Sequence, residues 1–384
     1  MSSKRLIAII GGTGAQGAPV VRDLLRSGDY SVRVLTRDMS NPRYKELEAF
    51  GPVEGITGSF ASEDTLRTMF RGAWGAFVNI DGFNSGEKTE IFWTIRGKLS
   101  VLAHWGGNLP GIVAWELALE EGVKFYVHGN IDYAYKKSGF RPEFHCGHYD
   151  AKGRMAEWML AMNKDPIVRS RMRSAAFTTS PYIEMTLHKA NPVFPVVEDG
   201  IATWYSPLND GAIPFTCLDD CGVYVKWLFD NADGEADGMD LEVGIAHITF
   251  EEYARAFTKV TGKPARWINN KIDDQITRVW GPKAEGPAGY NADPSDPATM
   301  SLRRNFRAWY TLWQNCGGDN PVLKRDYALL DRIHPTRIRS VEQWLRHENE
   351  KGLKQGLGTI WDRIQPENMG YVLKATEEGR AGTI

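Results

Sequence analysis

The chain has 384 residues, of which 42% are hydrophobic and 11% aromatic, which suits one large globular domain or two closely joined ones. Its 46 basic residues nearly balance 48 acidic ones, and the net charge of −2 gives no field that would draw the protein to nucleic acid or to an anionic membrane. No apolar run reaches the roughly 18 residues that a membrane-spanning helix needs.

Targeting signals and metal-binding patterns are both weak. The apolar run near the N-terminus is too short for a signal-peptide core, so we expect a cytoplasmic protein, or a nuclear one if its role is regulatory. The cysteines are too few for a disulfide framework and are expected to be reduced: Cys146, Cys217, Cys221 and Cys316. His145, Cys146 and His148 have no partner at zinc-like spacing, and we expect no metal.

Short apolar runs alternate with helical patterns through the first part of the chain. Residues 4–10 predict a strand buried on both faces, residues 18–26 a helix that stops at Gly28, and residues 31–36 a second strand. A helix, a strand, a helix and a strand are then expected at residues 64–70, 73–80, 112–121 and 124–128. This alternation predicts an α/β fold with a doubly wound parallel sheet.

Beyond residue 170 the alternation loosens. Residues 178–185 should leave the sheet through Pro181, and residues 219–229 and 249–261 predict helices with caps at Asp219 and Thr249. Gly, Pro and Asp dominate residues 280–300, which we expect to form a surface loop. We therefore expect residues 171–384 to form a smaller mixed C-terminal subdomain, for substrate or regulation, that is interleaved with the sheet.

The first strand and helix are joined by GGTGAQG, in which Gly11, Gly14 and Gly17 form the pattern G-x-x-G-x-x-G. Such a turn lets the main chain bend sharply, approach a pyrophosphate closely and point the amide groups of a helix start at negative charge. Because the pattern lies between a predicted strand and a predicted helix, residues 1–170 are predicted to form an NAD(P)-binding Rossmann domain.

The end of the second strand indicates which dinucleotide binds. An acidic residue there would hold a ribose hydroxyl of NAD, whereas Arg37 offers a guanidinium to the additional phosphate of NADP. Ser40 and Asn41 would add neutral donors. The sequence therefore favours NADP, with the alternative that Asp38, directly after Arg37, holds the ribose.

Six segments together resemble a known family. They are GGTGAQG at 11–17, LTRD at 35–38, the lysine of HYDAKG, TTSPY at 178–182, DGAIPF at 210–215 and KVTGKPA at 259–265. The combination resembles the NmrA-like family, a branch of the atypical short-chain dehydrogenases, and especially its fungal members, which often serve secondary-metabolite pathways. The resemblance implies a Rossmann domain that binds NADP(H), in a protein that is either a reductase or a redox sensor and transcriptional co-regulator.

The resemblance also implies a set of cofactor-binding residues. The glycine turn would hold the pyrophosphate and Arg37 the extra phosphate, with further contacts at the adenine, along the cofactor and at the nicotinamide. The full set is Gly11, Gly12, Thr13, Gly14, Ala15, Gln16 and Gly17; Arg37; Gly58 and Ser59 near the adenine; Asn79, Ile80 and Asp81 along the cofactor; Lys152 at the nicotinamide ribose; and Tyr182, Ile183, Glu184 and Met185 closing over the nicotinamide.

Three features depart from the family pattern. Ser59 stands where many relatives have an aspartate, which weakens the expectation for adenine recognition. Gly129 stands where short-chain dehydrogenases usually keep a serine that orients the substrate carbonyl. Residues 97–110 form an insert that matches nothing in the family, either a functional loop or translated intron.

His148 and Lys152 are the candidate catalytic residues. A short-chain dehydrogenase has a tyrosine four residues before its lysine, but here that position is His148, and Tyr149 is about 100° further round a helix and should point away. His148 could act as a general acid, since imidazole titrates near neutral pH, or could serve packing and ribose contact only.

Two functions therefore stay open. One is an NADPH-dependent oxidoreductase of a small organic molecule, in which Lys152 positions the nicotinamide and His148 or a water molecule gives the proton. The other is a sensor that binds NADP(H) without turnover and meets a regulatory protein partner. Direct DNA binding is disfavoured by the near-neutral charge.

Overall fold

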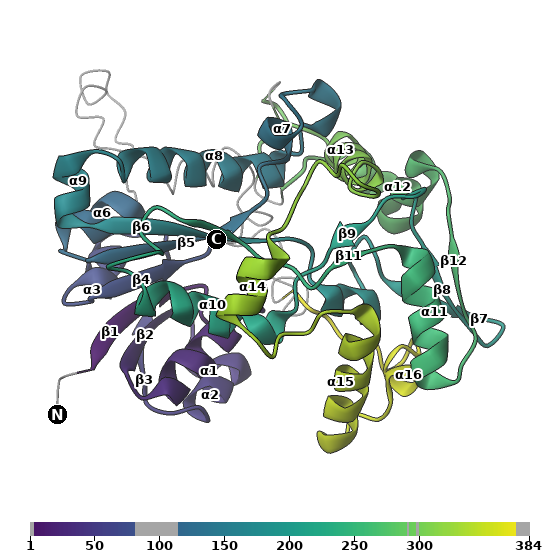
Figure 1. The fold of residues 1–384 in the computed structure, drawn as a ribbon, viewed down its shortest axis with the longest axis horizontal. Coiled ribbons are helices and arrows are strands. Elements are labelled where there is room, and N and C mark those ends of the chain that lie inside the picture. The colour runs from purple at the N-terminus through teal and green to yellow at the C-terminus, as the bar shows by residue number, and fades with distance from the viewer. Residues whose placement is uncertain (1–3, 81–113, 290–291, 297–298, 374–384) are drawn as a thin grey trace.

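A computed structural model describes residues 4–80, 114–289, 292–296 and 299–373. A large sheet carries helices on both faces, and a second group of helices and short strands lies beside it (Figure 1). Within the described ranges, no helix has the length and apolar character needed to cross a membrane.

The large sheet has seven strands in the order β10-β6-β5-β4-β1-β2-β3. Every neighbouring pair is parallel, and the part 3-2-1-4-5-6 is the strand order of the Rossmann fold. The predicted doubly wound parallel sheet is therefore confirmed. Its strands are β1 Arg5–Ile10, β2 Tyr30–Thr36, β3 Val53–Thr57, β4 Gly75–Val78, β5 Phe125–Ile131, β6 Arg173–Thr179 and β10 Asp240–Glu242.

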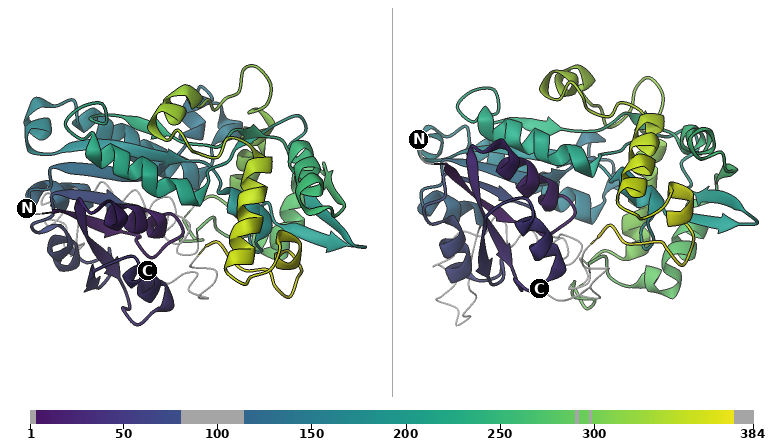
Figure 2. Two further views of the ribbon diagram at one scale, coloured as in Figure 1. Left: turned by 60° about the horizontal axis from the view of Figure 1, so that its bottom comes forward. Right: turned by 90° about the horizontal axis from the view of Figure 1, so that it is seen from below.

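Side chains alternate between the two faces of the sheet, so each apolar strand is buried twice. Ile7 and Ile9 of β1 pack with α1, α2, α10 and α14, while Ala8 and Ile10 pack with α3, α6 and α8. Figure 2 shows α1 and α10 side by side on the first of these faces. The helices of the two layers are α1 Gly17–Ser27, α2 Pro42–Glu48, α3 Glu63–Phe70, α6 Ala114–Glu120, α8 Gly147–Met162, α10 Leu218–Asp230 and α14 Tyr327–Ile333.

The remaining elements form the smaller mixed subdomain, as predicted. One sheet has the order β12-β8-β7, with β12 parallel and β7 antiparallel to β8, and β9 pairs antiparallel with β11. Their core contains the buried rings of Trp204, Trp313 and Trp344. The strands are β7 Pro195–Glu198, β8 Ile201–Tyr205, β9 Ile213–Pro214, β11 His247–Ile248 and β12 Ala265–Ile268; the helices are α11 Phe250–Thr261, α12 Ile272–Trp280, η4 Gly281–Glu285, α13 Leu302–Gln314, α15 Val341–Lys354 and α16 Ile360–Arg363.

Short helices connect the strand ends to these layers: α7 Ala134–Lys137, η2 Pro142–Phe144, α9 Pro166–Arg171 and η3 Ile183–Leu187. The chain leaves β6 just before Pro181, as expected. Strand β10 joins the sheet from far along the chain and pairs with β6. The expected insert at 97–110 and the candidate Asp81 lie outside the described residues.

The start of α10 corrects one expectation. The helix begins at Leu218 after Cys217, and no side chain of its own cap residue bonds to it. The cap is instead Glu184, whose Oε1 accepts the Leu218 N–H at 2.9 Å from 34 positions earlier in the chain. A local cap motif could not reveal it, because the partner is distant in sequence. Thr249 caps α11 as predicted, accepting the Glu252 N–H at 3.1 Å.

Candidate active site

Two glycines of the turn, Gly11 and Gly17, admit no side chain. Gly11 has a φ of +87°, and a Cβ there would lie 2.5 Å from the Asn79 carbonyl oxygen. A Cβ on Gly17 would lie 2.1 Å from the Gly11 carbonyl oxygen, which accepts the Gly14 N–H at 2.9 Å. The turn is therefore packed tightly against itself and against the end of β4, and glycine at positions 11 and 17 is what permits this packing.

The start of α1 suits a bound anion. The residue before it, Gln16, makes no capping bond to the helix, and the first turn has no acidic residue that would offset the helix dipole. The Gln16 side chain instead joins the ends of β6 and β4, donating to Thr179 Oγ1 at 3.4 Å and accepting from Asn79 Nδ2. The positive end of the helix dipole would therefore attract the negative charge of a pyrophosphate, and the fixed turn would hold it in place.

Local hydrogen bonds order the residues that follow β2. Asp38 Oδ1 already accepts two hydrogen bonds from Ser40, from its main-chain N–H at 2.8 Å and from its hydroxyl at 2.7 Å. Asn41 caps α2 by accepting the Arg43 N–H at 2.9 Å. Arg37 lies exposed at the strand end. Ser40 and Asn41 thus make local bonds, to Asp38 and to the start of α2, and the assignment of Arg37 to the 2′-phosphate stays a prediction.

Gly58 and Ser59, expected near the adenine, follow β3. The Gly58 N–H donates to the Thr36 carbonyl at 2.9 Å, and a Cβ on Gly58 would lie 2.6 Å from the side chain of Thr65. Ser59 Oγ accepts the Ala61 N–H at 3.1 Å, so the hydroxyl orders the turn into α3. Both residues lie at the carboxyl edge of the sheet, where the expected adenine contact would form.

Lys152 is buried between the end of β4 and strand β5. Its ammonium donates to Asn79 Oδ1 at 3.2 Å, to the Ile80 carbonyl at 2.7 Å and to the Gly129 carbonyl at 3.5 Å. The structure thus brings Gln16, Asn79, Ile80 and Lys152 together beside the glycine turn. These oxygens fix the position of the ammonium, and its bond to the nicotinamide ribose stays a prediction.

Gly129 has a structural reason to lack a side chain. A Cβ there would lie 2.6 Å from Asn79 Cβ and 2.9 Å from its Cγ. The serine that short-chain dehydrogenases keep at this place would displace the Asn79 side chain that binds Gln16 and Lys152. The departure noticed in the sequence is therefore coupled to the packing of Asn79.

Helix α8 is held at its start by a buried carboxylate. Asp150 Oδ2 accepts the Cys146 N–H at 2.9 Å and Oδ1 accepts the Tyr135 N–H at 3.1 Å. Burial raises the pKa of Asp150 to about 7. These bonds fix the loop before α8 and therefore the positions of His148 and Lys152 on the helix.

His148 is held by a helix of the C-terminal subdomain. Its Nδ1 lies 2.9 Å from Nδ2 and 3.2 Å from Oδ1 of Asn305 on α13, and 3.3 Å from Cys146 Sγ. The ring of Tyr149 is buried in the core of the C-terminal subdomain, where its hydroxyl accepts from Trp309 Nε1 at 3.3 Å, so Tyr149 does not point toward Lys152. Asn305 was not singled out in the sequence, because it lies 157 positions from His148 with no local signal.

Cysteine, histidine and asparagine in contact suggest a nucleophile triad, but the geometry is wrong for one. In such a triad the base uses one ring nitrogen for the nucleophile and the other for the orienting group. Here Cys146 and Asn305 both meet Nδ1 of His148, and Cys146 is fully buried. The arrangement orients the imidazole and does not activate the thiol.

The segment expected over the nicotinamide lies partly within the C-terminal core. Tyr182 pairs with Thr216 as an isolated bridge, and the Ile183 side chain is fully buried. Glu184 is also buried, which raises its pKa to about 8, and it caps α10. Met185 is partly buried. Any cofactor contact of Ile183 would therefore come from its main chain.

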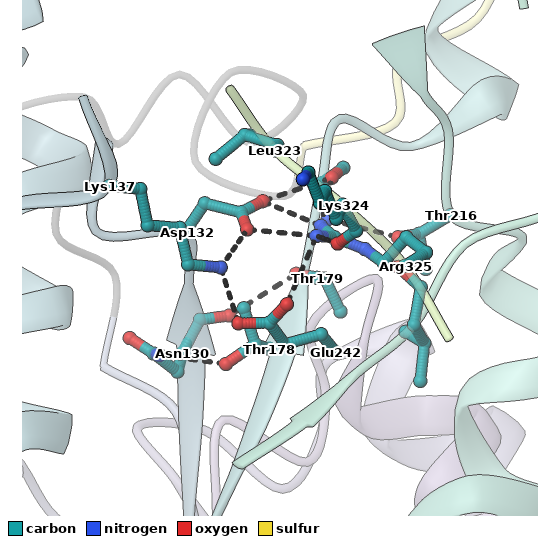
Figure 3. A network of polar contacts seen from close by, with 12 residues as sticks. Asn130, Asp132, Lys137, Thr178, Thr179, Thr216, Glu242, Leu323, Lys324 and Arg325 are labelled. Atoms are coloured by element: carbon teal, nitrogen blue, oxygen red, sulfur yellow. Dashed lines mark hydrogen bonds and ion pairs between the residues drawn. The ribbon is translucent and has the colours of Figure 1, made fainter. Parts of the chain in front are cut away.

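A buried charge network lies beyond the ends of β5 and β6 and was not foreseen from the sequence (Figure 3). Arg325 binds Asp132 through two hydrogen bonds of 3.0 and 2.7 Å and donates to Ser180 Oγ at 2.7 Å. Lys137 bridges Asp132 and Glu242. Burial alone would raise the pKa of Asp132, but the charges of Arg325 and Lys137 outweigh it and hold the pKa well below its ordinary value.

One cluster has the ligand types of a metal site. Asp219, His347 and Glu348 place ligand atoms close together. The ammonium of Lys351 lies 2.6 Å from Asp219 Oδ2 and 3.2 Å from Glu348 Oε1, so a positive charge already neutralises these carboxylates. The cluster is therefore an ion-pair network between α10 and α15.

A doubly wound parallel sheet, with a glycine turn at the carboxyl end of its first strand and an uncapped helix start beyond it, defines a Rossmann-type dinucleotide-binding protein. The model of the NmrA-like family matches residues 3–278, and the chain belongs to this family.

Individual relatives agree with this assignment. The NmrA-like family domain-containing oxidoreductase lnaB of Aspergillus flavus is 30% identical over 277 residues, which cover 69% of this chain and 75% of that protein. The NmrA-like family domain-containing oxidoreductase himF of Aspergillus japonicus is 25% identical over 291 residues, covering 74% and 82%.

Solved structures show the same fold. NmrA, a negative transcriptional regulator, in complex with NADP superposes with a TM-score of 0.63 at 16% identity, over 93% of this chain and 99% of that one. The NADPH-dependent quinone oxidoreductase QOR2 of Escherichia coli, complexed with NADPH, gives 0.59 at 17% identity, over 89% and 99%.

Proposed function

We propose that the protein is an NADP-dependent oxidoreductase that acts on a small organic molecule. The observation that carries the proposal is the buried ammonium of Lys152, which lies with Asn79 and Ile80 beside the glycine turn. Relatives at 25–30% identity are named oxidoreductases, and two structural neighbours were solved with NADP or NADPH.

The residues present fit the cofactor. A Cβ on Gly11 or Gly17 would collide with main-chain atoms, so glycine keeps the tight turn that a pyrophosphate needs, and the uncapped start of α1 would receive the pyrophosphate. Arg37 would bind the 2′-phosphate, and Lys152 the nicotinamide ribose. Bound NADPH would supply a hydride; the chain would orient it and exclude water.

The test uses the full chain and three acceptors of stated class: cyclohexanone, cyclohexenone and pyrroline. NADPH binding is followed by fluorescence titration and turnover by loss of nicotinamide absorbance. Lys152→Met should weaken NADPH binding at least about tenfold, whereas Lys164→Met, near the end of the same helix, should not. Arg37→Ser should weaken NADP and leave NAD unchanged.

A redox sensor with a regulatory protein partner is the second candidate. It is favoured by the glycine at position 129, which removes one donor to a substrate carbonyl, and by the orientation of Tyr149. Tight NADPH binding without oxidation in the presence of any acceptor would support the sensor. Failure to bind either dinucleotide would contradict both functions.

A further inference from the structure

A series of side-chain hydrogen bonds leads from Lys152 to the end of β6. Lys152 Nζ donates to Asn79 Oδ1 at 3.2 Å, and Asn79 Nδ2 donates to Gln16 Oε1. Gln16 Nε2 donates to Thr179 Oγ1 at 3.4 Å, and the Thr179 hydroxyl donates to the Asn130 carbonyl at 3.3 Å. These bonds connect α8 with the glycine turn and with strands β6 and β5.

The direction of these bonds is set at Lys152. An ammonium group has donors and no acceptor, so the atom of Asn79 that faces it must be the amide oxygen. The amide nitrogen of Asn79 then faces Gln16, which must present its own oxygen and direct its nitrogen to Thr179. Turning either amide over would bring two donors face to face. The charge of Lys152 therefore fixes both amides, whose oxygens point toward it.

Gln16 links these bonds to the glycine turn. It is the last residue before α1, it makes no capping bond to that helix, and a Cβ on the next residue, Gly17, would collide with the turn. The main chain of Gln16 therefore belongs to the turn that would meet the pyrophosphate. Its buried side chain reaches Asn79, the partner of the ammonium that would meet the nicotinamide ribose.

Asn79 is the contact of Lys152 whose position Gln16 can control. The oxygens of Ile80 and Gly129 that accept from the ammonium, at 2.7 and 3.5 Å, belong to the main chain. Asn79 uses a side chain, which Gln16 holds from one side. Gly129 limits it from the other side, since a Cβ there would lie 2.6 Å from Asn79 Cβ. The amide of Asn79 is therefore held between the glycine turn and β5.

We infer that Gln16 is a positioning residue that acts through Asn79 on Lys152, and that it couples binding of the pyrophosphate at the turn to binding of the nicotinamide ribose at the ammonium. The inference rests on the NADP binding of the proposed function and deepens it. A ligand with both groups gains from binding groups held at a fixed separation, because less freedom is lost on binding. A ligand without the nicotinamide ribose gains nothing from the Gln16 side chain.

The test is a double-mutant cycle on NADPH affinity, measured by fluorescence titration of the full chain. Gln16→Met removes both side-chain bonds of Gln16 and should weaken NADPH binding about tenfold, as is expected of Lys152→Met. Once Lys152 is replaced, Gln16 has no ammonium to position, so the double variant should bind NADPH within about twofold of Lys152→Met alone. Independent losses would multiply to about a hundredfold, and that result would overturn the inference.

A fragment of the cofactor separates positioning from a merely structural role. Adenosine 2′,5′-bisphosphate carries the 2′-phosphate and a 5′-phosphate but no nicotinamide ribose. Gln16→Met should leave its affinity, measured by calorimetry, within about twofold of the wild-type value. An equal loss of affinity for this fragment and for NADPH would show that the substitution only loosens the glycine turn, which contradicts a role through Lys152.

Gln275→Met is the matched control. Gln275 is also buried, and its Nε2 donates to the Tyr205 carbonyl at 2.8 Å in the C-terminal subdomain. The NADPH affinity of this variant should equal that of the wild type. If Gln16→Met does not fold, Thr179→Val removes the oxygen that receives the Gln16 N–H and should weaken NADPH binding about threefold. That loss should disappear in the Lys152→Met background, and its persistence there would equally overturn the inference.

These titrations need no turnover, so they separate the inference from the proposed function. A protein that shows the expected cycle but oxidises NADPH with no acceptor would contradict the oxidoreductase and support the role of Gln16. Multiplying losses in a protein that does reduce an acceptor would contradict the role of Gln16 alone. Absence of NADPH binding by the wild type would contradict both.

Discussion

The buried network in Figure 3 allows a quantitative prediction for Arg325→Met. The side chains of Arg325 and Asp132 are both fully buried, and the substitution removes the two bonds to Asp132, one to Ser180 and one to the Val243 carbonyl at 2.9 Å. Breaking a buried pair from one side costs about 3–5 kcal/mol, because the other charge stays buried. Lys137 remains 3.0 Å from Asp132, so we expect a loss of about 3 kcal/mol.

Urea unfolding followed by circular dichroism measures this loss. The double variant Asp132→Asn with Arg325→Met also removes the unpaired buried carboxylate of Asp132 and should recover most of the stability. Arg332→Met serves as the control, since Arg332 pairs with Glu235 at the surface, and its unfolding midpoint should hardly move. If the double variant is as unstable as Arg325→Met alone, the uncompensated carboxylate is not the cause.

Two further substitutions test other parts of the site. Gly17→Ala would place a Cβ 2.1 Å from the Gly11 carbonyl oxygen and should destabilise the fold by roughly 1–3 kcal/mol and weaken NADPH binding. Gly234→Ala, where a Cβ has room, should change neither stability nor binding. Equal NADPH affinity in both variants would contradict the packed turn. Burial raises the pKa of Glu184 from 4.5 to about 8, so between these pH values the folded state keeps a proton that the unfolded state loses. The free energy of unfolding should therefore fall by about 1.4 kcal/mol per pH unit as the pH rises from 4.5 to about 8. Glu184→Gln should remove this slope and Glu251→Gln, at the surface, should keep it; a slope unchanged in Glu184→Gln would show that the carboxyl titrates normally.

The first strands and helices could be predicted because their signals are local. The apolar run of β1, the glycines after it and the helical spacing of α1 all lie within adjacent residues. Strand β3 and helix α2 were missed. The β3 side chains are only partly buried or exposed, as on the outer strand of a sheet, and the segment lacks a strong apolar pattern.

The candidate site was predicted where main chain and single motifs define it and missed where distant segments meet. Asn305 contacts His148 across 157 positions, and Arg325 contacts Asp132 across 193. A buried arginine and a surface arginine look alike in sequence, since only the fold brings a carboxylate to one of them. The same limit explains the misplaced start of α10, whose cap is Glu184.

Residues beyond position 278 contact the Rossmann part of the chain: Asn305 contacts His148, and Arg325 contacts Asp132. These contacts determine where the protein can be truncated. A fragment cut after residue 278, where similarity to the family ends, would keep every strand of the large sheet. It would nevertheless lose Arg325, so that the buried Asp132 carboxylate would keep only Lys137 as a charged partner. It would also lose Asn305, which holds the imidazole of His148. The limit of sequence similarity is therefore not the limit of the cooperative unit, and truncation libraries should extend past Arg325.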